Sequence, residues 1–169
     1  MSNKTIRFTI LAILMALIIL TSASLQADSH IVNATLLHTN DFHGRLETDY
    51  RGRGGSAYIS DKVNDIRDAV GEENVLLLDA GDEFFGAPAI SQLLLGESTI
   101  DIYNMMGYDA ATFVNHEFDK GQEVLMERVA QSDYPWLGAN IVLEGTDWEY
   151  PSYVMPYTYL TVGTGAHEA

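Results

Sequence analysis

The sequence predicts an α/β fold in which short strands alternate with helices around a largely parallel sheet. Two patterns support this prediction. Residues 74–79 form a short continuous apolar run, which is typical of a strand buried on both faces. Residues 56–70 carry apolar side chains at spacings of 4, 3 and 4, which form one stripe of a helix (Ile59, Val63, Ile66 and Val70).

The other elements follow the same alternation along the chain. We expect further strands at residues 31–39, 109–114 and 136–142, and further helices at residues 89–95, 99–106 and 121–131. Residues 150–161 contain two prolines and four tyrosines and are interpreted as an edge strand or a loop. The sequence therefore predicts a sheet that stops after four or five strands.

The amino-terminal segment, residues 1–27, differs from the rest of the chain. Lys4 and Arg7 precede an apolar run over residues 8–20, and small and polar residues follow it. This order is typical of a secretory signal peptide, and the run is shorter than the roughly 18–20 residues that a membrane-spanning helix needs. An uncleaved amino-terminal anchor is the alternative. We expect a secreted, periplasmic or cell-surface protein without a stable membrane span, whose residues 28–169 belong to one incomplete domain.

The composition excludes several classes of function. The chain has 24 acidic and 9 basic side chains, a formal net charge of −15, and no cysteine. The lack of cysteine excludes a disulfide framework, a cysteine-ligated zinc site, an iron–sulfur cluster and a thiol nucleophile. The negative charge argues against a nucleic acid partner, which needs a basic surface. An acidic protein that acts on phosphate must supply cations through placed arginines or metal ions.

Polar clusters follow three of the predicted strands. They occupy residues 39–44 (Thr-Asn-Asp-Phe-His-Gly), 79–82 (Asp-Ala-Gly-Asp) and 115–119 (Asn-His-Glu-Phe-Asp). Because the carboxyl ends of parallel strands converge on one crevice, we expect Asp41, Asp82 and Asn115 to be neighbours in space. Each cluster alone also fits an ordinary polar turn, and the order of all three makes the pattern specific.

The side chains in these clusters suit a hard or borderline divalent ion. Asp41 and Asp82 offer carboxylate oxygens, His43 an imidazole nitrogen and Asn115 an amide oxygen. Such donors fit Mn²⁺, Zn²⁺, Mg²⁺ or Fe²⁺. Two such ions about 3.5–4 Å apart can clamp a phosphoryl group and activate water for its hydrolysis.

These three motifs resemble successive blocks of the secreted 5′-nucleotidases of the calcineurin-like metallophosphoesterase superfamily. The resemblance extends over about residues 34–142, including residues 101–108 and 137–141. It implies a metallophosphoesterase sandwich of β–α units that hydrolyses nucleoside monophosphates to nucleoside and phosphate. It also implies two divalent ions in the full-length family and a carboxyl-terminal nucleotide-binding domain that this sequence lacks.

The resemblance also implies individual roles. The metal ligands would be Asp41 and His43 on one ion, Asp82 between both ions, and Asn115 on the second. His116 would stabilise the transition state or protonate the leaving oxygen, and Asp119 would orient its ring. Relatives that act on cyclic or 3′-nucleotides tend to carry asparagine at the position of Asp119, which favours a 5′-nucleotide substrate here.

Two departures from the family pattern affect the expected activity. Val114 stands where the family has glycine, and a β-branched residue would strain that loop if the position required a positive φ. The later metal-ligating histidines of the family have no counterpart. We therefore expect impaired hydrolysis and at most one well-bound ion. The alternatives are a phosphoesterase of the same superfamily that acts on cyclic nucleotides, 3′-nucleotides or nucleotide sugars, and a non-catalytic exported metal-binding module.

Overall fold

A computed structural model describes residues 31–86 and 88–163 of the chain, and the compact unit begins at Val32. The predicted signal peptide, residues 1–27, lies outside the described residues. Among the helices of the described part, none has both the length and the apolar character needed to cross a membrane.

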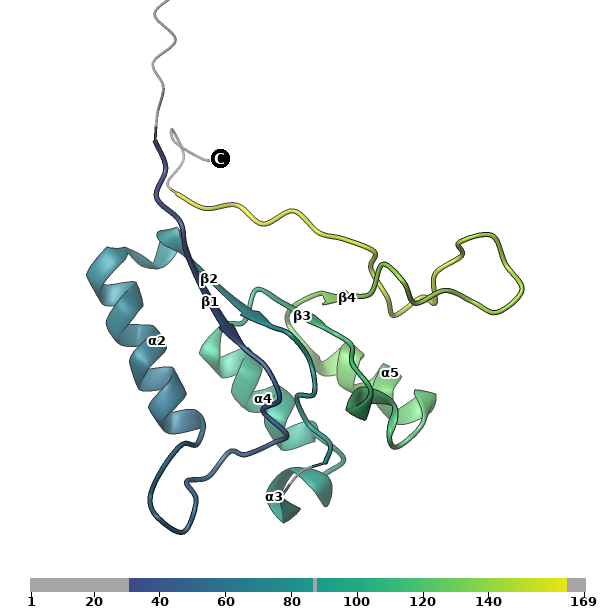
Figure 1. Cartoon of the computed structure of the whole chain (residues 1–169), viewed down its shortest axis with the longest axis horizontal. Helices are drawn as coiled ribbons and strands as arrows, with labels where there is room; N and C mark the ends of the chain where they lie inside the picture. Colours follow the sequence, from purple (N-terminus) through teal and green to yellow (C-terminus); the bar gives the residue numbers. More distant parts are fainter. Residues whose placement is uncertain (1–30, 87, 164–169) are drawn as a thin grey trace, which may run out of the picture. The chain divides into compact units, whose positions relative to one another are not determined.

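Four parallel strands form the sheet, in the order in which they occur along the chain. They are β1 (Thr35–Thr39), β2 (Val75–Asp79), β3 (Ala110–Thr112) and β4 (Trp136–Leu137). The predicted α/β class and parallel sheet are therefore confirmed (Figure 1). The strand predicted over residues 136–142 is much shorter in the structure, because the Gly138 N–H donates to the Met155 carbonyl and a turn follows at once.

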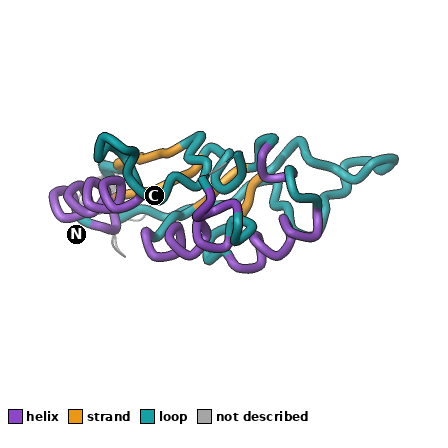
Figure 2. The backbone as a smooth tube through the Cα atoms, turned by 90° about the horizontal axis from the view of Figure 1, so that it is seen from below, coloured by secondary structure: helices purple, strands orange, loops and turns teal. Residues whose placement is uncertain are grey.

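The helices are α2 (Ser56–Val70), α3 (Ala89–Gln92), α4 (Glu97–Met106) and α5 (Gln122–Gln131). Each connection between neighbouring parallel strands contains at least one of them. Because such crossovers are right-handed and the strand order is sequential, the helices lie on one side of the strands (Figure 2). The predicted helix over residues 56–70 is confirmed, whereas the one over residues 89–95 ends early, before Leu95 adopts a left-handed backbone.

The hydrophobic core lies between the sheet and these helices. Leu77 from β2, Ile100 and Tyr103 from α4, Leu125 from α5 and Trp136 from β4 are all almost fully buried. Burial of large apolar and aromatic side chains supplies most of the driving force for folding. The packed core therefore holds in place the strand ends that carry the polar clusters.

The carboxyl-terminal part of the described chain, residues 139–163, is irregular. Met155 forms an isolated bridge to Leu137 beside β4, and the Gly163 N–H donates to the Glu73 carbonyl (2.8 Å). The region predicted as an edge strand or a loop is thus mainly a loop, and it runs along the open edge of β4 in Figure 1.

Candidate metal centre

Three loops carry the polar clusters, and each follows the carboxyl end of a strand. The first loop is residues 40–46 after β1, the second is residues 80–86 after β2, and the third is residues 113–119 after β3. Backbone hydrogen bonds join the first two loops along their length: Ala80 N–H to Thr39 O (2.8 Å), Asp41 N–H to Gly81 O (3.0 Å), His43 N–H to Asp82 O (2.8 Å) and Gly44 N–H to Glu83 O (2.6 Å).

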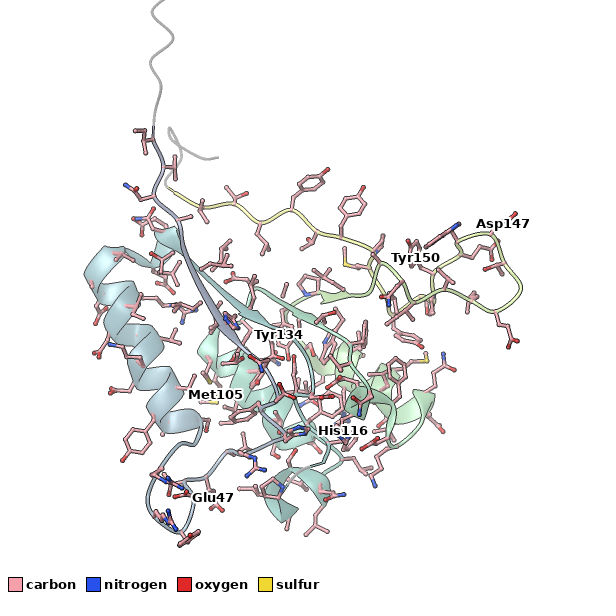
Figure 3. All side chains as sticks on the ribbon, in the orientation of Figure 1. Glu47, Met105, His116, Tyr134, Asp147 and Tyr150 are labelled. Atoms are coloured by element: carbon pink, nitrogen blue, oxygen red, sulfur yellow. The ribbon has the colours of Figure 1, made fainter. Side chains whose placement is uncertain are left out.

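One side chain from each loop meets the other two. His43, Asp82 and His116 each offer a nitrogen or carboxylate oxygen, and these atoms all lie within 4.8 Å of one another. The two imidazole rings meet edge to face with centroids 4.9 Å apart. Figure 3 places His116 at the end of the sheet where the loops gather. The predicted convergence of the loops is present in the structure.

The backbone of these loops is strained at the acidic and histidine positions. Asp41, His43 and Asp82 have positive φ angles of 52°, 50° and 57°, a region that residues other than glycine seldom occupy. Such conformations cost free energy, about 1–3 kcal/mol each, and they cluster at functional sites. Two of the three, His43 and Asp82, contribute side chains to the group that the three loops bring together.

The ring of His43 is oriented by the second loop. Its Nδ1 lies 2.7 Å from the Phe85 carbonyl oxygen, which fixes the proton on Nδ1 and leaves Nε2 free to ligate. Gly86 lies close to both imidazole rings. A Cβ at Gly86 would lie 3.0 Å from His43 Nδ1 and 3.2 Å from His116 Cε1, so only glycine leaves the rings their present positions.

His116 is oriented from the opposite side by Asp119. His116 Nδ1 lies 2.7 Å from Asp119 Oδ2, so Nδ1–H donates to the carboxylate and Nε2 is left for another partner. The hydrogen bond that His116 donates to Asp119 raises the pKa of His116 above its ordinary value, and desolvation of the ring offsets part of this increase. A ring that favours the protonated state suits a proton donor better than a metal ligand, which must be neutral.

The other two predicted ligands lie at the margin of this group. Asp41 Oδ1 is 4.0 Å from His43 Nε2, and the Asp41 carboxylate is largely exposed and accepts a hydrogen bond from Asn40. Asn115 is exposed in the turn that begins a short 3₁₀ helix, His116–Phe118, and its carbonyl accepts the Phe118 N–H. Both residues stand next to a member of the triad formed by His43, Asp82 and His116.

Val114 fits the third loop without the anticipated strain. Its φ angle is not positive, so the β-branched side chain meets no backbone penalty there. Its Cγ2 methyl occupies the space beside Gly81, where a Cβ on the glycine would lie only 2.3 Å away. The condition under which Val114 would strain the loop is therefore not met, and the missing side chain of Gly81 leaves room for the valine.

Three buried carboxyl groups in or next to the loops were not identified from the sequence. Asp79, Glu83 and Glu117 are all at most 4% exposed. Burial raises the pKa of Asp79 to about 6 and raises the pKa of Glu83 well above its ordinary range. The sequence holds one signal for them, since a glutamate within an otherwise apolar Glu-Phe-Phe run is out of pattern for a surface residue.

The donor set fits a divalent cation. The His43 imidazole and the Asp82 carboxylate are ligands that zinc, manganese and iron share, and the hydrogen bond to the Phe85 carbonyl fixes the His43 ring. His43 Nε2 and the Asp82 carboxylate would hold the ion, with Asp41 and Asn115 close to the same loops.

No family model matches the chain, but individual proteins do. Snake venom 5′-nucleotidase of Gloydius brevicauda is 34% identical over 153 residues, which are 84% of this chain and 26% of that protein. The 5′-nucleotidase of Bos taurus is 39% identical over 141 residues, 76% of this chain and 24% of that protein. The chain thus spans about a quarter of the length of the curated relatives it matches.

Solved structures agree with these relatives. The NAD nucleotidase of Haemophilus influenzae superposes with a TM-score of 0.62 and 27% identity, over 80% of this chain and 25% of that one. A 5′-nucleotidase precursor of Thermus thermophilus gives a TM-score of 0.58 and 28% identity, over 77% of this chain and 26% of that one. By sequence, the chain matches the amino-terminal part of the 5′-nucleotidases, and it has the fold of the calcineurin-like phosphoesterases.

Proposed function

We propose that this chain takes part in the divalent-metal-dependent hydrolysis of nucleoside 5′-monophosphates to nucleoside and phosphate. The observation that carries the proposal is the convergence of His43, Asp82 and His116 from three loops, on a backbone strained at two of the three. The relatives that are named 5′-nucleotidases support the same reaction class.

The proposed roles follow from the orientation of each side chain. His43 and Asp82 would hold an ion together with Asp41, and Asn115 would serve a second ion. Bound ions would supply positive charge to the phosphoryl group and activate water for attack. Because His43 and Asp82 lie together while Asn115 is exposed at the margin of the group, we expect one ion to bind well to this chain.

His116 is the proposed proton donor. The Asp119 carboxylate holds the proton on Nδ1 and stabilises the charged ring, which leaves Nε2–H as the group that can donate a proton to the substrate. A protonated imidazole there offsets negative charge on the phosphoryl oxygens and protonates the leaving ribose oxygen. Asp119 therefore acts through His116 and does not itself touch the substrate.

The proposal also covers the place of the chain in a longer enzyme. Residues 28–169 would form the amino-terminal part of a metallophosphoesterase domain, and residues 1–27 would direct export. The venom origin of one relative is consistent with export. A nucleotide-binding domain in the full-length protein would select the base.

Metal binding gives the first test. Calorimetric titration of Mn²⁺ into the purified chain should show saturable binding, and Asp82→Asn should weaken it at least about tenfold, as loss of a direct ligand does. Asp61→Asn is the matched control, because it removes an exposed carboxylate on α2, far along the chain from the three loops. A folded chain that bound neither Mn²⁺ nor Zn²⁺ saturably would contradict the proposal and favour a non-catalytic module.

Substrate choice needs a second assay. Phosphate release should be measured with AMP, 3′-AMP, cyclic AMP with a coupled phosphatase, and NAD, each with Mn²⁺. We expect AMP to be preferred and turnover to be slow. Preference for cyclic or 3′-nucleotides would replace the proposed substrate class with that of related phosphoesterases.

A further inference from the structure

The loops of the candidate metal centre are joined in two different ways. Backbone hydrogen bonds lock the first loop to the second, whatever side chains these loops carry. Within residues 31–86 and 88–163, the hydrogen bonds found between the second and third loops each use a side-chain acceptor. The position of His116 relative to Asp82 therefore depends on particular side chains.

Glu117 supplies the main connection. Its carboxylate is fully buried, and its two oxygens accept different backbone donors. Oε1 accepts the N–H of Glu83 in the second loop at 2.8 Å, and Oε2 accepts the N–H of Val114 in the third loop at 2.8 Å. A single carboxylate thus bridges the two strand ends, and each donor lies one residue from a proposed ligand, Asp82 or Asn115.

The second connection uses the proposed metal ligand itself. The His116 N–H donates to Asp82 Oδ1 at 3.1 Å. A cation that bound Asp82 would draw on the same oxygen lone pairs, so this contact is the weaker restraint when metal is present. Glu117 keeps its two hydrogen bonds in either case, because neither of them uses a side-chain atom of the triad.

We propose that Glu117 is a positioning residue that sets the separation of the second and third loops, and with it that of the proposed ligands Asp82 and Asn115, and so determines metal affinity. This inference rests on the proposed function only for the identity of Asp82 and Asn115 as metal ligands. A carboxylate is required because both backbone partners are donors. A glutamine accepts through one atom only, so its NH₂ group would face the second N–H and force the loops apart.

The test compares two isosteric substitutions at neighbouring buried positions. Glu117→Gln should weaken Mn²⁺ binding by about 10–100-fold in calorimetry, the range expected when an outer-sphere partner is lost. Glu83→Gln is the matched control, because Glu83 is equally buried but its carboxylate accepts only the Tyr134 hydroxyl, through Oε2, and a glutamine oxygen can keep that contact. It should change the dissociation constant less than about threefold.

Thermal unfolding without metal separates positioning from plain stability. If Glu117→Gln lowered the unfolding temperature but bound Mn²⁺ as the wild type does, the residue would be structural only and the proposal would be overturned. Amide hydrogen exchange on the wild-type chain gives a reading that needs no variant. The Glu83 and Val114 amides should exchange slowly, and exchange at the rate of an open loop would also overturn it.

The outcomes distinguish this inference from the proposed function. A wild-type chain that bound no Mn²⁺ would contradict the function, and the exchange rates of the two amides would then decide the role of Glu117. A wild-type chain that bound Mn²⁺, with Glu117→Gln binding equally well, would leave the function standing and refute the positioning role.

Discussion

Replacing Gly86 with alanine tests whether the geometry of the two imidazoles controls metal binding. Gly86 has a φ of +69°, so alanine there costs about 1–2 kcal/mol in the backbone alone. The added Cβ would also lie 3.0 Å from His43 Nδ1 and 3.2 Å from His116 Cε1, closer than carbon normally approaches either atom. The rings must then shift by a few tenths of an ångström, which disturbs both hydrogen bonds that orient them.

Gly52 offers a control with nearly the same backbone. Its φ is +70°, and a Cβ there would meet nothing within 4 Å. Gly52→Ala should therefore share the backbone cost and leave the rings untouched. We expect Gly86→Ala to raise the Mn²⁺ dissociation constant about tenfold relative to Gly52→Ala, which is about 1.4 kcal/mol. Equal dissociation constants for the two variants in calorimetry would refute the reasoning.

Three further predictions concern His116, the buried acid and the core. Asp119→Asn should lower the pKa of His116 toward its ordinary value in an NMR titration, and an unchanged pKa would show that the hydrogen bond has no such effect. Asp79 has a pKa of about 6 in the folded chain, above its value in the unfolded chain, so folding favours its protonated form. Its contribution to the free energy of unfolding is therefore complete below about pH 4 and is lost as the pH rises through about 6. The free energy of unfolding measured in urea should fall over this pH range, and Asp79→Asn should make that fall smaller. An equal fall in the variant would exclude Asp79 as the cause. Leu125→Ala should cost about 2–5 kcal/mol in the same assay, against less than about 0.5 kcal/mol for exposed Met126→Ala.

Much of the fold could be predicted from local pattern. The helix at Ser56–Val70 was predictable because one apolar stripe faces the sheet, and β2 because a short continuous apolar run is typical of a strand. The expectation that β2 is buried on both faces is wrong, because the helices cover one face only and alternate residues of β2 are half-buried. The short β4 could not be predicted, since its end depends on a hydrogen bond from Gly138 to distant Met155. No local sequence pattern indicates which distant residue accepts this hydrogen bond.

The candidate site was predictable for a different reason. The carboxyl ends of neighbouring parallel strands lie at the same edge of a sheet. The positions of polar residues that follow such strands can therefore be predicted without knowing how their side chains are oriented. The buried carboxylate of Glu117 was missed because its partners are backbone amides, which every residue has and no sequence pattern marks. Side-chain orientation at Asp41 and His43 likewise depends on a left-handed backbone that residue types alone do not indicate.

The contact between Val114 and Gly81 makes these two positions a matched pair. The valine uses space that Gly81 leaves open, so any side chain at position 81 would collide with Val114 in addition to its strained positive φ. Gly81 belongs to a motif that resembles the family pattern, whereas Val114 departs from it. The second loop therefore already has the room that the valine needs, and a third loop with glycine at position 114 would leave Gly81 in contact with solvent instead of a methyl group.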